Sequence, residues 1–504
     1  MILEILERFF DMLKNQALGL IQGLARSRVA VAGALVSGLV LPVLLFSVLL
    51  DMRGVVENPY FGFLIYMVMG PLFVAGLVTV AVGLLLFRDK EEIGLFALEY
   101  IREQMAMPGR LTRVRRLIYL TLFLSLLIVA VIGVVSYTGF TYTQSVSFCG
   151  QLCHTVMEPE YITYQNSAHS RVACVDCHIG VNAGGFTKSK ISGIRMIFAT
   201  LFDRFERPIA TPISSLRPTR EVCEQCHRPE KFHGDRLYIK DGYLPDEKNT
   251  HVRTVLLMRV GSGGYRGQVA QGIHWHVSDR HFTYYQEDPA RPGVISRIKL
   301  IDHDGAVVVY QRGEGQAGKA FEGRANYRLM DCLDCHNRPT HVFLSPDEAL
   351  DGKINTGAIP ARLPFVKKLG LELVQRQYPS KEQARRQIAE GVAGWYGEKY
   401  PELKKSSARE LDKAAAGIYQ AWAENVFPEM KIYWNTYGSR LGHRDGSGCF
   451  RCHSEELVSR EGRVISSDCN LCHVVLADRQ PAPDIMRILK GNGTPQLSGG
   501  GEGM

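Results

Sequence analysis

Long uncharged apolar stretches dominate the first 140 residues of the chain. Residues 29–50, 61–87 and 117–137 each reach the roughly 20 residues that a helix needs to cross a hydrocarbon core. A buried helix of a soluble domain seldom runs this long without a charge. The pattern therefore predicts three transmembrane helices, with kinks expected at Pro42 and Pro71 in the first two.

Positive charges set the expected orientation. Arginine and lysine are concentrated before the first span and in residues 88–116, whereas residues 51–60 contain only Arg53. Because basic segments stay in the cytoplasm, the N-terminus and residues 88–116 are predicted to be cytoplasmic and the chain after residue 140 periplasmic, in a bacterial inner membrane. No small-residue cleavage site follows the first apolar run, so we expect it to remain as an anchor. Residues 1–25 have amphipathic helical spacing, which favours a helix on the cytoplasmic membrane surface over a regulatory module.

Beyond residue 140 the pattern changes twice. Strand-like sequences at 255–260, 281–285, 294–301 and 306–310, separated by turn residues, predict a small antiparallel sheet. Helical periodicity follows at 363–378, 381–400 and 407–426, and Ser380 is a suitable N-cap for the second of these helices. The expected fold class is a mainly α membrane protein whose membrane helices are followed by a loop- and helix-rich region with a small antiparallel β insert.

All twelve cysteines of the 504-residue chain lie in six motifs of the form Cys-X2-Cys-His, widened once to Cys-X3-Cys-His. Two thiols at this spacing add across the vinyl groups of one haem, and the following histidine can ligate the iron. Zinc knuckles also use Cys-X2-Cys pairs, but they need two pairs per metal and give no reason for the histidines. The sequence therefore predicts six covalently bound c-type haems. The motif residues are Cys149, Cys153 and His154; Cys174, Cys177 and His178; Cys223, Cys226 and His227; Cys332, Cys335 and His336; Cys449, Cys452 and His453; Cys469, Cys472 and His473.

The spacing of the motifs predicts how the chain is organised. The segments are an amphipathic surface helix (1–25), a three-helix membrane anchor (26–140), a three-haem domain (141–235), a β-rich insert (236–325), a helical brace with three haems (326–478) and a flexible tail (479–504).

Nine further histidines are available to occupy the second face of each iron. Imidazole on both faces keeps reduction potentials low and leaves no open position for a substrate, which favours electron transfer over catalysis. Met157 follows the wide first motif, whose spacing displaces His154, and is a candidate additional or substitute ligand there. The expected distal ligands are His169, His233, His341, His443 and one or both of His274 and His276.

The formal net charge of +8 does not point to nucleic acid. The basic residues are scattered, no nucleic-acid-binding motif is present, and haem propionates would change the surface charge of the complete protein.

The residues around the motifs resemble a known family. Residues 148–161, 167–170 and 174–180 are similar to the haem-bearing start of the NapC/NirT/NrfH family of membrane quinol dehydrogenases. Residues 217–232, 273–276, 332–341, 448–453 and 468–473 resemble a larger subgroup that includes the three-span inner-membrane cytochromes of metal-reducing bacteria. Three spans in place of one, and the widened first motif, depart from the family pattern.

This resemblance implies that menaquinol or a similar quinol binds near the first haem, with Met157 in the position of the family's haem-one methionine. Oxidation of a quinol releases two protons with two electrons, so a titratable group must lie within hydrogen-bond reach. The candidate groups are Glu158, Glu160, Lys188 and Lys190.

The predicted function is oxidation of the membrane quinol pool, with electrons passing through six haems to a periplasmic cytochrome or reductase. Two alternatives stay open. The chain could be an electron-relay subunit of a larger respiratory complex, or a reductase that binds a small oxyanion at an open haem. The surplus of histidines disfavours the reductase.

Overall fold

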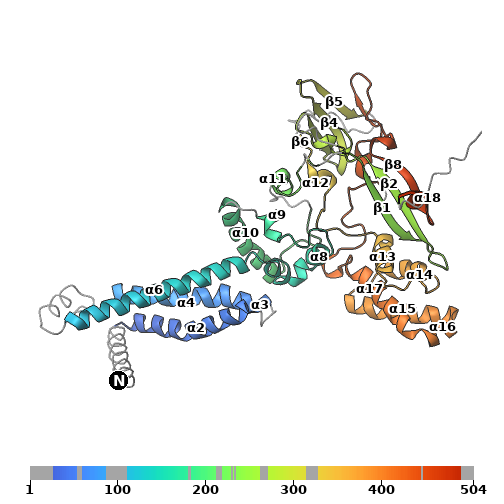
Figure 1. The fold of residues 1–504 in the computed structure, drawn as a ribbon. Helices are drawn as coiled ribbons and strands as arrows, with labels where there is room; N and C mark the ends of the chain where they lie inside the picture. The colour runs from blue at the N-terminus through green and yellow to red at the C-terminus, as the bar shows by residue number, and fades with distance from the viewer. Residues whose placement is uncertain are drawn as a thin grey trace, which may run out of the picture. The chain divides into compact units, whose positions relative to one another are not determined.

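The computed structural model divides the chain into two compact units, Met1–His154 and Thr155–Met504 (Figure 1). The predicted surface helix at 1–25 and most of the basic loop at 88–116 lie outside the described residues. The described residues are 27–53, 59–86, 111–179, 183–211, 218–228, 231, 234–261, 271–313, 327–443 and 447–489.

The first unit is helical, and three of its stretches are long and apolar enough to cross a membrane: Arg28–Asp51, Tyr60–Gly83 and Leu122–Tyr142. They match the three spans that the sequence predicts. Pro42 lies inside the first, and Pro71 follows a π-helical segment in the second. The elements are α2 (Arg28–Met52), α3 (Pro59–Phe63), the π-helix η1 (Leu64–Met69), α4 (Gly70–Leu86), α6 (Leu111–Tyr142) and α7 (Val146–Gln151).

Glycine brings α2 and α4 close together. A Cβ at Gly33 would lie 2.6 Å from the Gly76 carbonyl oxygen, and a Cβ at Gly83 would collide with the backbone of Ala30. Small residues at such contacts are how helices associate in lipid, where burying apolar side chains gives little driving force. Many large apolar side chains of the spans are exposed, among them Leu39, Phe123 and Leu126. This is the distribution expected of helices that face lipid.

The second unit contains two antiparallel sheets, in the strand orders β1-β2-β8 and β6-β3-β4-β5-β7. The four strands predicted from the sequence are present as β2 to β5, and their antiparallel pairing is confirmed, but β2 lies in one sheet and β3, β4 and β5 lie in the other, so the expectation of a single sheet is wrong. The sheets also recruit β7 and β8 from the C-terminal part of the chain. The strands are β1 (Arg236–Tyr243), β2 (His251–Met258), β3 (Phe282–Asp288), β4 (Arg291–Ile301), β5 (Val307–Arg312), β6 (Arg328–Leu329), β7 (Leu457–Ser459) and β8 (His473–Gln480).

A helical bundle forms the largest apolar core of the second unit. Trp422, Tyr396, Ile388, Leu373 and Leu350 are fully buried in it. The predicted cap is confirmed, because the Ser380 hydroxyl accepts a hydrogen bond from the Gln383 amide at 3.2 Å. The bundle helices are α13 (Pro346–Asn355), α14 (Val366–Val374), α15 (Lys381–Lys399), α16 (Pro401–Ser406) and α17 (Ala408–Ala423).

Further helices and turns of this unit lie in the motif segments or between them. They are α8 (His154–Gln165), α9 (Cys174–His178), α10 (Ala183–Leu201), α11 (Thr219–Cys223), α12 (Cys332–Cys335) and the 3-10 turns η4 (Ile273–Val277), η5 (Pro428–Met430), η6 (Gly448–Arg451) and η7 (Cys469–Leu471). A last helix, α18 (Asp484–Leu489), follows β8, so regular structure reaches into the segment 479–504 that the sequence predicts as a tail.

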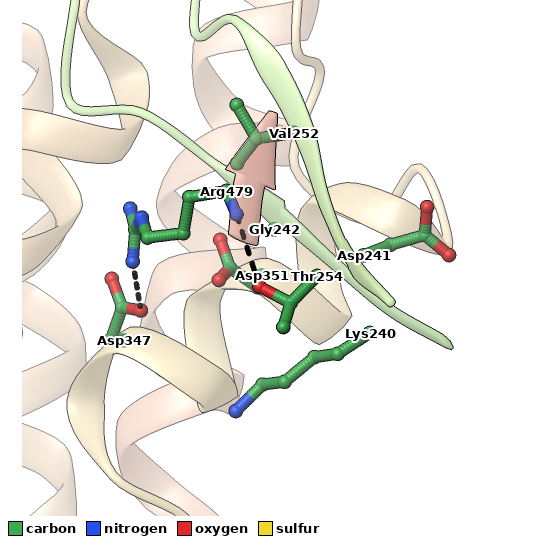
Figure 2. Close-up of a pocket in the computed structure, with 8 residues that line it drawn as sticks. All are labelled: Lys240, Asp241, Gly242, Val252, Thr254, Asp347, Asp351 and Arg479. Carbon is green, nitrogen blue, oxygen red and sulfur yellow. Dashed lines mark hydrogen bonds and ion pairs between the residues drawn. The ribbon is translucent and has the colours of Figure 1, made fainter. Parts of the chain in front are cut away.

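A buried ion cluster joins the bundle to the β1-β2-β8 sheet. The fully buried Lys367 ammonium of α14 donates to the Asp351 carboxylate and lies 3.0 Å from an Asp347 carboxylate oxygen, both on α13. Asp351 also accepts a hydrogen bond from the Tyr243 amide of β1 at 3.0 Å. Figure 2 shows the polar pocket beside this cluster, where Arg479 of β8 approaches Asp347 at 3.8 Å. The ion pairs and hydrogen bonds of Lys367, Asp351 and Asp347 therefore connect the helices α13 and α14 to strands β1 and β8 of the sheet.

We predict that Lys367→Met destabilises the protein by about 3 kcal/mol, because it leaves the Asp351 carboxylate buried without a cation. Urea unfolding of the detergent-solubilised protein, followed by far-ultraviolet circular dichroism, measures this. The matched control is Lys405→Met, whose side chain is 74 % exposed and which should change stability by less than about 0.5 kcal/mol. Equal stability of the two variants would contradict the structural role of the cluster.

Candidate haem centres

Each motif of the second unit is built on a single helical turn. The amides of His227 and His336 donate to the carbonyls of Cys223 and Cys332 at 2.8 Å, as in an α-helix. Positions i, i+3 and i+4 share one helix face, so such a turn presents both thiols and the histidine in the same direction. In the first motif the histidine stands at i+5 from Cys149, and this rotates it away from that face. The side chain of His154 lies outside the described residues.

No disulfide joins any of the cysteines, all of which lie in the part of the chain that the structure describes. Within the described residues, the one group of three or more His, Cys, Asp or Glu side chains with converging ligand atoms is Asp302, His303 and Asp304. That group is exposed and contains no cysteine. The thiols are therefore not gathered in fours, as zinc knuckles would require.

Four motif histidines each face a histidine from another part of the second unit. Two metal–imidazole bonds of about 2 Å, plus about 1.1 Å from each nitrogen to its ring centre, place two axial imidazole centroids about 6 Å apart. The observed centroid distances are 6.4 Å for His178 and His341, 5.9 Å for His227 and His169, 5.8 Å for His453 and His276, and 6.1 Å for His473 and His443. The spacing of all four pairs fits one iron between two imidazoles.

A fifth motif histidine also has a histidine neighbour. His336 interacts electrostatically with His274, which lies two residues before His276 in η4. Five of the six predicted distal ligands are thus placed next to motif histidines. The sixth, His233, lies outside the described residues.

Backbone carbonyls fix the tautomer of the distal histidines. The Nδ1 atoms of His169, His274, His276 and His341 lie 2.8 to 3.2 Å from the carbonyl oxygens of Pro339, Val260, Ile273 and Glu160. A carbonyl only accepts hydrogen bonds, so Nδ1 carries the proton and Nε2 keeps its lone pair for a metal. Burial lowers the pKa of His274, His276 and His341, and this maintains the neutral form that ligation requires.

Unpaired polar atoms gather around the same sites. Among the described residues, the buried side-chain atoms without a hydrogen-bond partner are His281 Nε2, Thr283 Oγ1, Gln286 Oε1, Arg451 Nη1 and His473 Nδ1. Arg451 and His473 belong to the fifth and sixth motifs. His281, just before β3, stacks on Trp275 between the two η4 histidines, with ring centroids 3.8 Å apart. Buried polar groups are normally paired, so these atoms suit a site that a polar cofactor completes. The Arg451 guanidinium in particular suits a haem propionate.

The five motifs of the second unit adjoin one another in chain order. A hydrogen bond between the Cys223 and Cys332 thiols raises the pKa of Cys223, and one between Cys449 and Cys472 lowers the pKa of Cys449 to about 6. Burial raises the pKa of Cys177, and the nearby Cys226 thiol of the third motif adds to this.

Hydrogen bonds between motif loops reinforce this order. The Thr219 hydroxyl in α11 donates to Asp331 beside α12 at 2.9 Å, and the Arg451 guanidinium donates to the Asp334 carbonyl at 2.6 Å. The second to sixth motifs therefore form one continuous row.

The acidic residues proposed for quinol oxidation are both paired. Glu160 lies 2.9 Å from the Arg338 guanidinium and 3.0 Å from His341 Nδ1, whereas the more exposed Glu158 lies 2.8 Å from Lys381. Met157 is half-buried in α8, three residues after His154. Lys188 and Lys190 lie in α10, but their side chains are outside the described residues. The contact of Arg338 with Glu160 gives no signal in the sequence, since the two residues are far apart along the chain.

Comparisons with known proteins identify the family of the chain. The family model described as "NapC/NirT cytochrome c family, N-terminal region" matches residues 112–211, which include the first two motifs. The chain is 36 % identical over 453 residues to the cytochrome c-type protein ImcH of Geobacter sulfurreducens, covering 90 % of this chain and 88 % of that protein. No solved structure matches.

The predicted resemblance is thereby confirmed, and covalently bound haem c follows from it as the cofactor. With three candidate membrane spans and these haem-attachment motifs, the chain belongs to the NapC/NirT family of membrane c-type cytochromes.

Proposed function

We propose that this protein is an inner-membrane quinol dehydrogenase that oxidises menaquinol or a similar quinol and passes the electrons through six haems to a periplasmic cytochrome or reductase. The facing histidine pairs are the observation that supports this most. An iron held by two imidazoles has no open position for a small substrate, so it serves electron transfer. Haem supplies one-electron redox chemistry, and the protein supplies attachment, ligation and environment.

The proposed ligands follow from the pairs. Each motif attaches one haem through its two thiols. The proposed axial pairs are His178 with His341, His227 with His169, His336 with His274, His453 with His276 and His473 with His443. His154 and Met157 are the proposed ligands of the first haem, and His233 is a further candidate for an axial position.

The row of motifs supports the proposed route of electrons. Neighbouring motifs share thiol contacts or loop hydrogen bonds from the second to the sixth, so the attached haems would be close enough for rapid transfer. We propose that electrons enter at the first haem and leave from the last pair.

Proton release is the part of the reaction that side chains must perform. When a quinol becomes a quinone, both O–H bonds break, two electrons leave and two protons must be accepted. The Glu160 carboxylate forms ion pairs with Arg338 and His341, and its side chain is 19 % exposed. The Glu158 side chain is 41 % exposed and forms an ion pair with Lys381. We therefore propose Glu158 as the first proton acceptor and Glu160 as the group that orients His341, with Lys188 and Lys190 as further candidates for binding the quinol oxygens.

We predict that the purified protein carries six haems per chain. Intact-mass measurement and a pyridine haemochrome assay both report this ratio. Changing Cys449 to serine should lower the ratio of haem to protein towards five. The fifth motif would then have only the Cys452 thiol, and a single thioether holds a haem poorly. A wild-type ratio of five would contradict the count of six, and an unmodified mass would overturn the haem assignment altogether.

We predict that His341→Met raises the potential of one haem by on the order of 0.1 V, because thioether in place of imidazole favours the ferrous state. A spectroscopic redox titration of the purified protein measures this. The control is His303→Met, whose imidazole is 72 % exposed and pairs with Asp302, and which should leave every potential unchanged. If His341→Met also leaves all potentials unchanged, the pairing with His178 is wrong.

We predict that a menaquinol analogue reduces the haems in stopped-flow measurements, and that Glu158→Gln slows the first reduction at least about a hundredfold by removing the proton acceptor. Glu398→Gln, at a 72 % exposed position, is the matched control and should reduce at the wild-type rate. Absence of reduction in the purified chain would refute quinol oxidation by this protein. Reduction that occurs only when other subunits co-purify in mild detergent would favour the relay-subunit alternative.

A further inference from the structure

The helix α10 carries a row of large apolar side chains that no other part of the second unit covers. It follows α9, which carries the second motif (Figure 1), and four residues separate His178 from its first residue, Ala183. Between 36 and 72 % of each side chain is exposed at Ile191, Ile194, Ile197, Phe198, Leu201 and Phe202. None of these residues belongs to an apolar core of the described structure. An exposed apolar surface of this kind marks a place where something else binds.

The apolar side chains fall on one face. At about 100° per residue, positions 191, 194, 197, 198, 201 and 202 lie within an arc of about 140°, which is the width of a typical amphipathic stripe. Ser189, Ser192 and Thr200 project on the opposite side, together with Met196. Phe198 and Phe202 stack along the stripe with ring centroids 6.3 Å apart. The pattern is thus a stripe on a helix and not a general excess of apolar residues.

The charges of this segment are of one sign. Between Asp176 and Asp203 the chain contains no acidic residue, whereas Lys188, Lys190 and Arg195 are present. By the same spacing, positions 188 and 195 flank the stripe, and position 190 falls within its arc just before Ile191. A basic helix with an apolar stripe suits an anionic lipid surface, because a lysine at the end of the stripe can extend its ammonium group to the headgroups. The same chain has candidate membrane spans that end at Tyr142, which keeps the second unit at a bilayer.

We propose that α10 lies on the lipid bilayer, with the stripe of Ile191, Ile194, Ile197, Phe198 and Leu201 in the boundary between headgroups and acyl chains. Its C-terminal end is fixed to the second unit, because Phe205 and Ile209 pack against the cluster of Phe427, Met430 and Ile432. The helix is therefore a second membrane contact, in addition to the membrane spans. It holds the chain segment that contains the second motif at the surface of the bilayer. This inference does not depend on quinol oxidation.

Carbene labelling from the bilayer tests the proposal on the full-length haem-loaded protein. The protein is reconstituted into vesicles of phosphatidylethanolamine and phosphatidylglycerol that contain a phospholipid with a diazirine on its acyl chain. After illumination and trypsin digestion, the peptide 196–204 should carry at least about ten times more label than the peptide 300–312. The second peptide contains Val307 and Val309, which are exposed apolar residues of β5, and it controls for exposure alone.

Two single variants sharpen the test. Phe198→Glu places a charge on the stripe and should reduce labelling of the helix at least about fivefold, whereas Met196→Glu, on the opposite face and similarly exposed, should leave it unchanged. Neither side chain is buried, so the haem absorption spectrum should stay that of the wild type. The proposal would be overturned if the two peptides were labelled equally, or if both variants lost labelling to the same extent. It would also be overturned if the helix cross-linked to a second copy of the chain instead of to lipid.

Discussion

Iron held between two neutral imidazoles requires pairs of histidine rings about 6 Å apart. Four pairs of histidine rings in the second unit satisfy this requirement. The ring pairs lie at 5.8 to 6.4 Å. Carbonyl oxygens at Pro339, Val260, Ile273 and Glu160 hold the distal rings in one tautomer. Loops that look irregular are thus tied to these histidines by hydrogen bonds, and in the proposed arrangement their backbone geometry orients the rings for ligation.

The regular elements bring together histidines that are distant in sequence. Strand β8 begins at His473, and its pairing with β2 aligns that residue with Met258. The bundle of α13 to α17 separates the fourth motif from the fifth by more than a hundred residues, yet Arg451 reaches the Asp334 carbonyl. Sheet and bundle are in turn joined by Lys367 and the acidic residues around it. The scaffold therefore places residues from both ends of the unit in one row.

The features that could be predicted from the sequence are those that neighbouring residues along the chain determine. The membrane spans, the Ser380 cap and strands β2 to β5 follow from local patterns, and all of them are present. The partners of the histidines could not be predicted in the same way. His169 stands five residues before the second motif, yet it faces His227 of the third, because the fold and not the chain order decides which imidazoles meet. Strands β7 and β8 were missed since they are short or adjoin motifs and pair with distant strands. The engagement of Glu160 with Arg338 is likewise visible only in three dimensions.

The 3-10 turn Ile273–Val277 holds both His274 and His276, and these face the histidines of two successive motifs. In the proposed arrangement, this turn of five residues supplies one ligand to each of two neighbouring haems. Because His274 and His276 share this short backbone segment, a displacement of the turn would move both imidazole rings together, so the geometries of the two proposed centres would be mechanically coupled. In that arrangement, a change confined to one of the two centres would have to come from the motif that faces the turn.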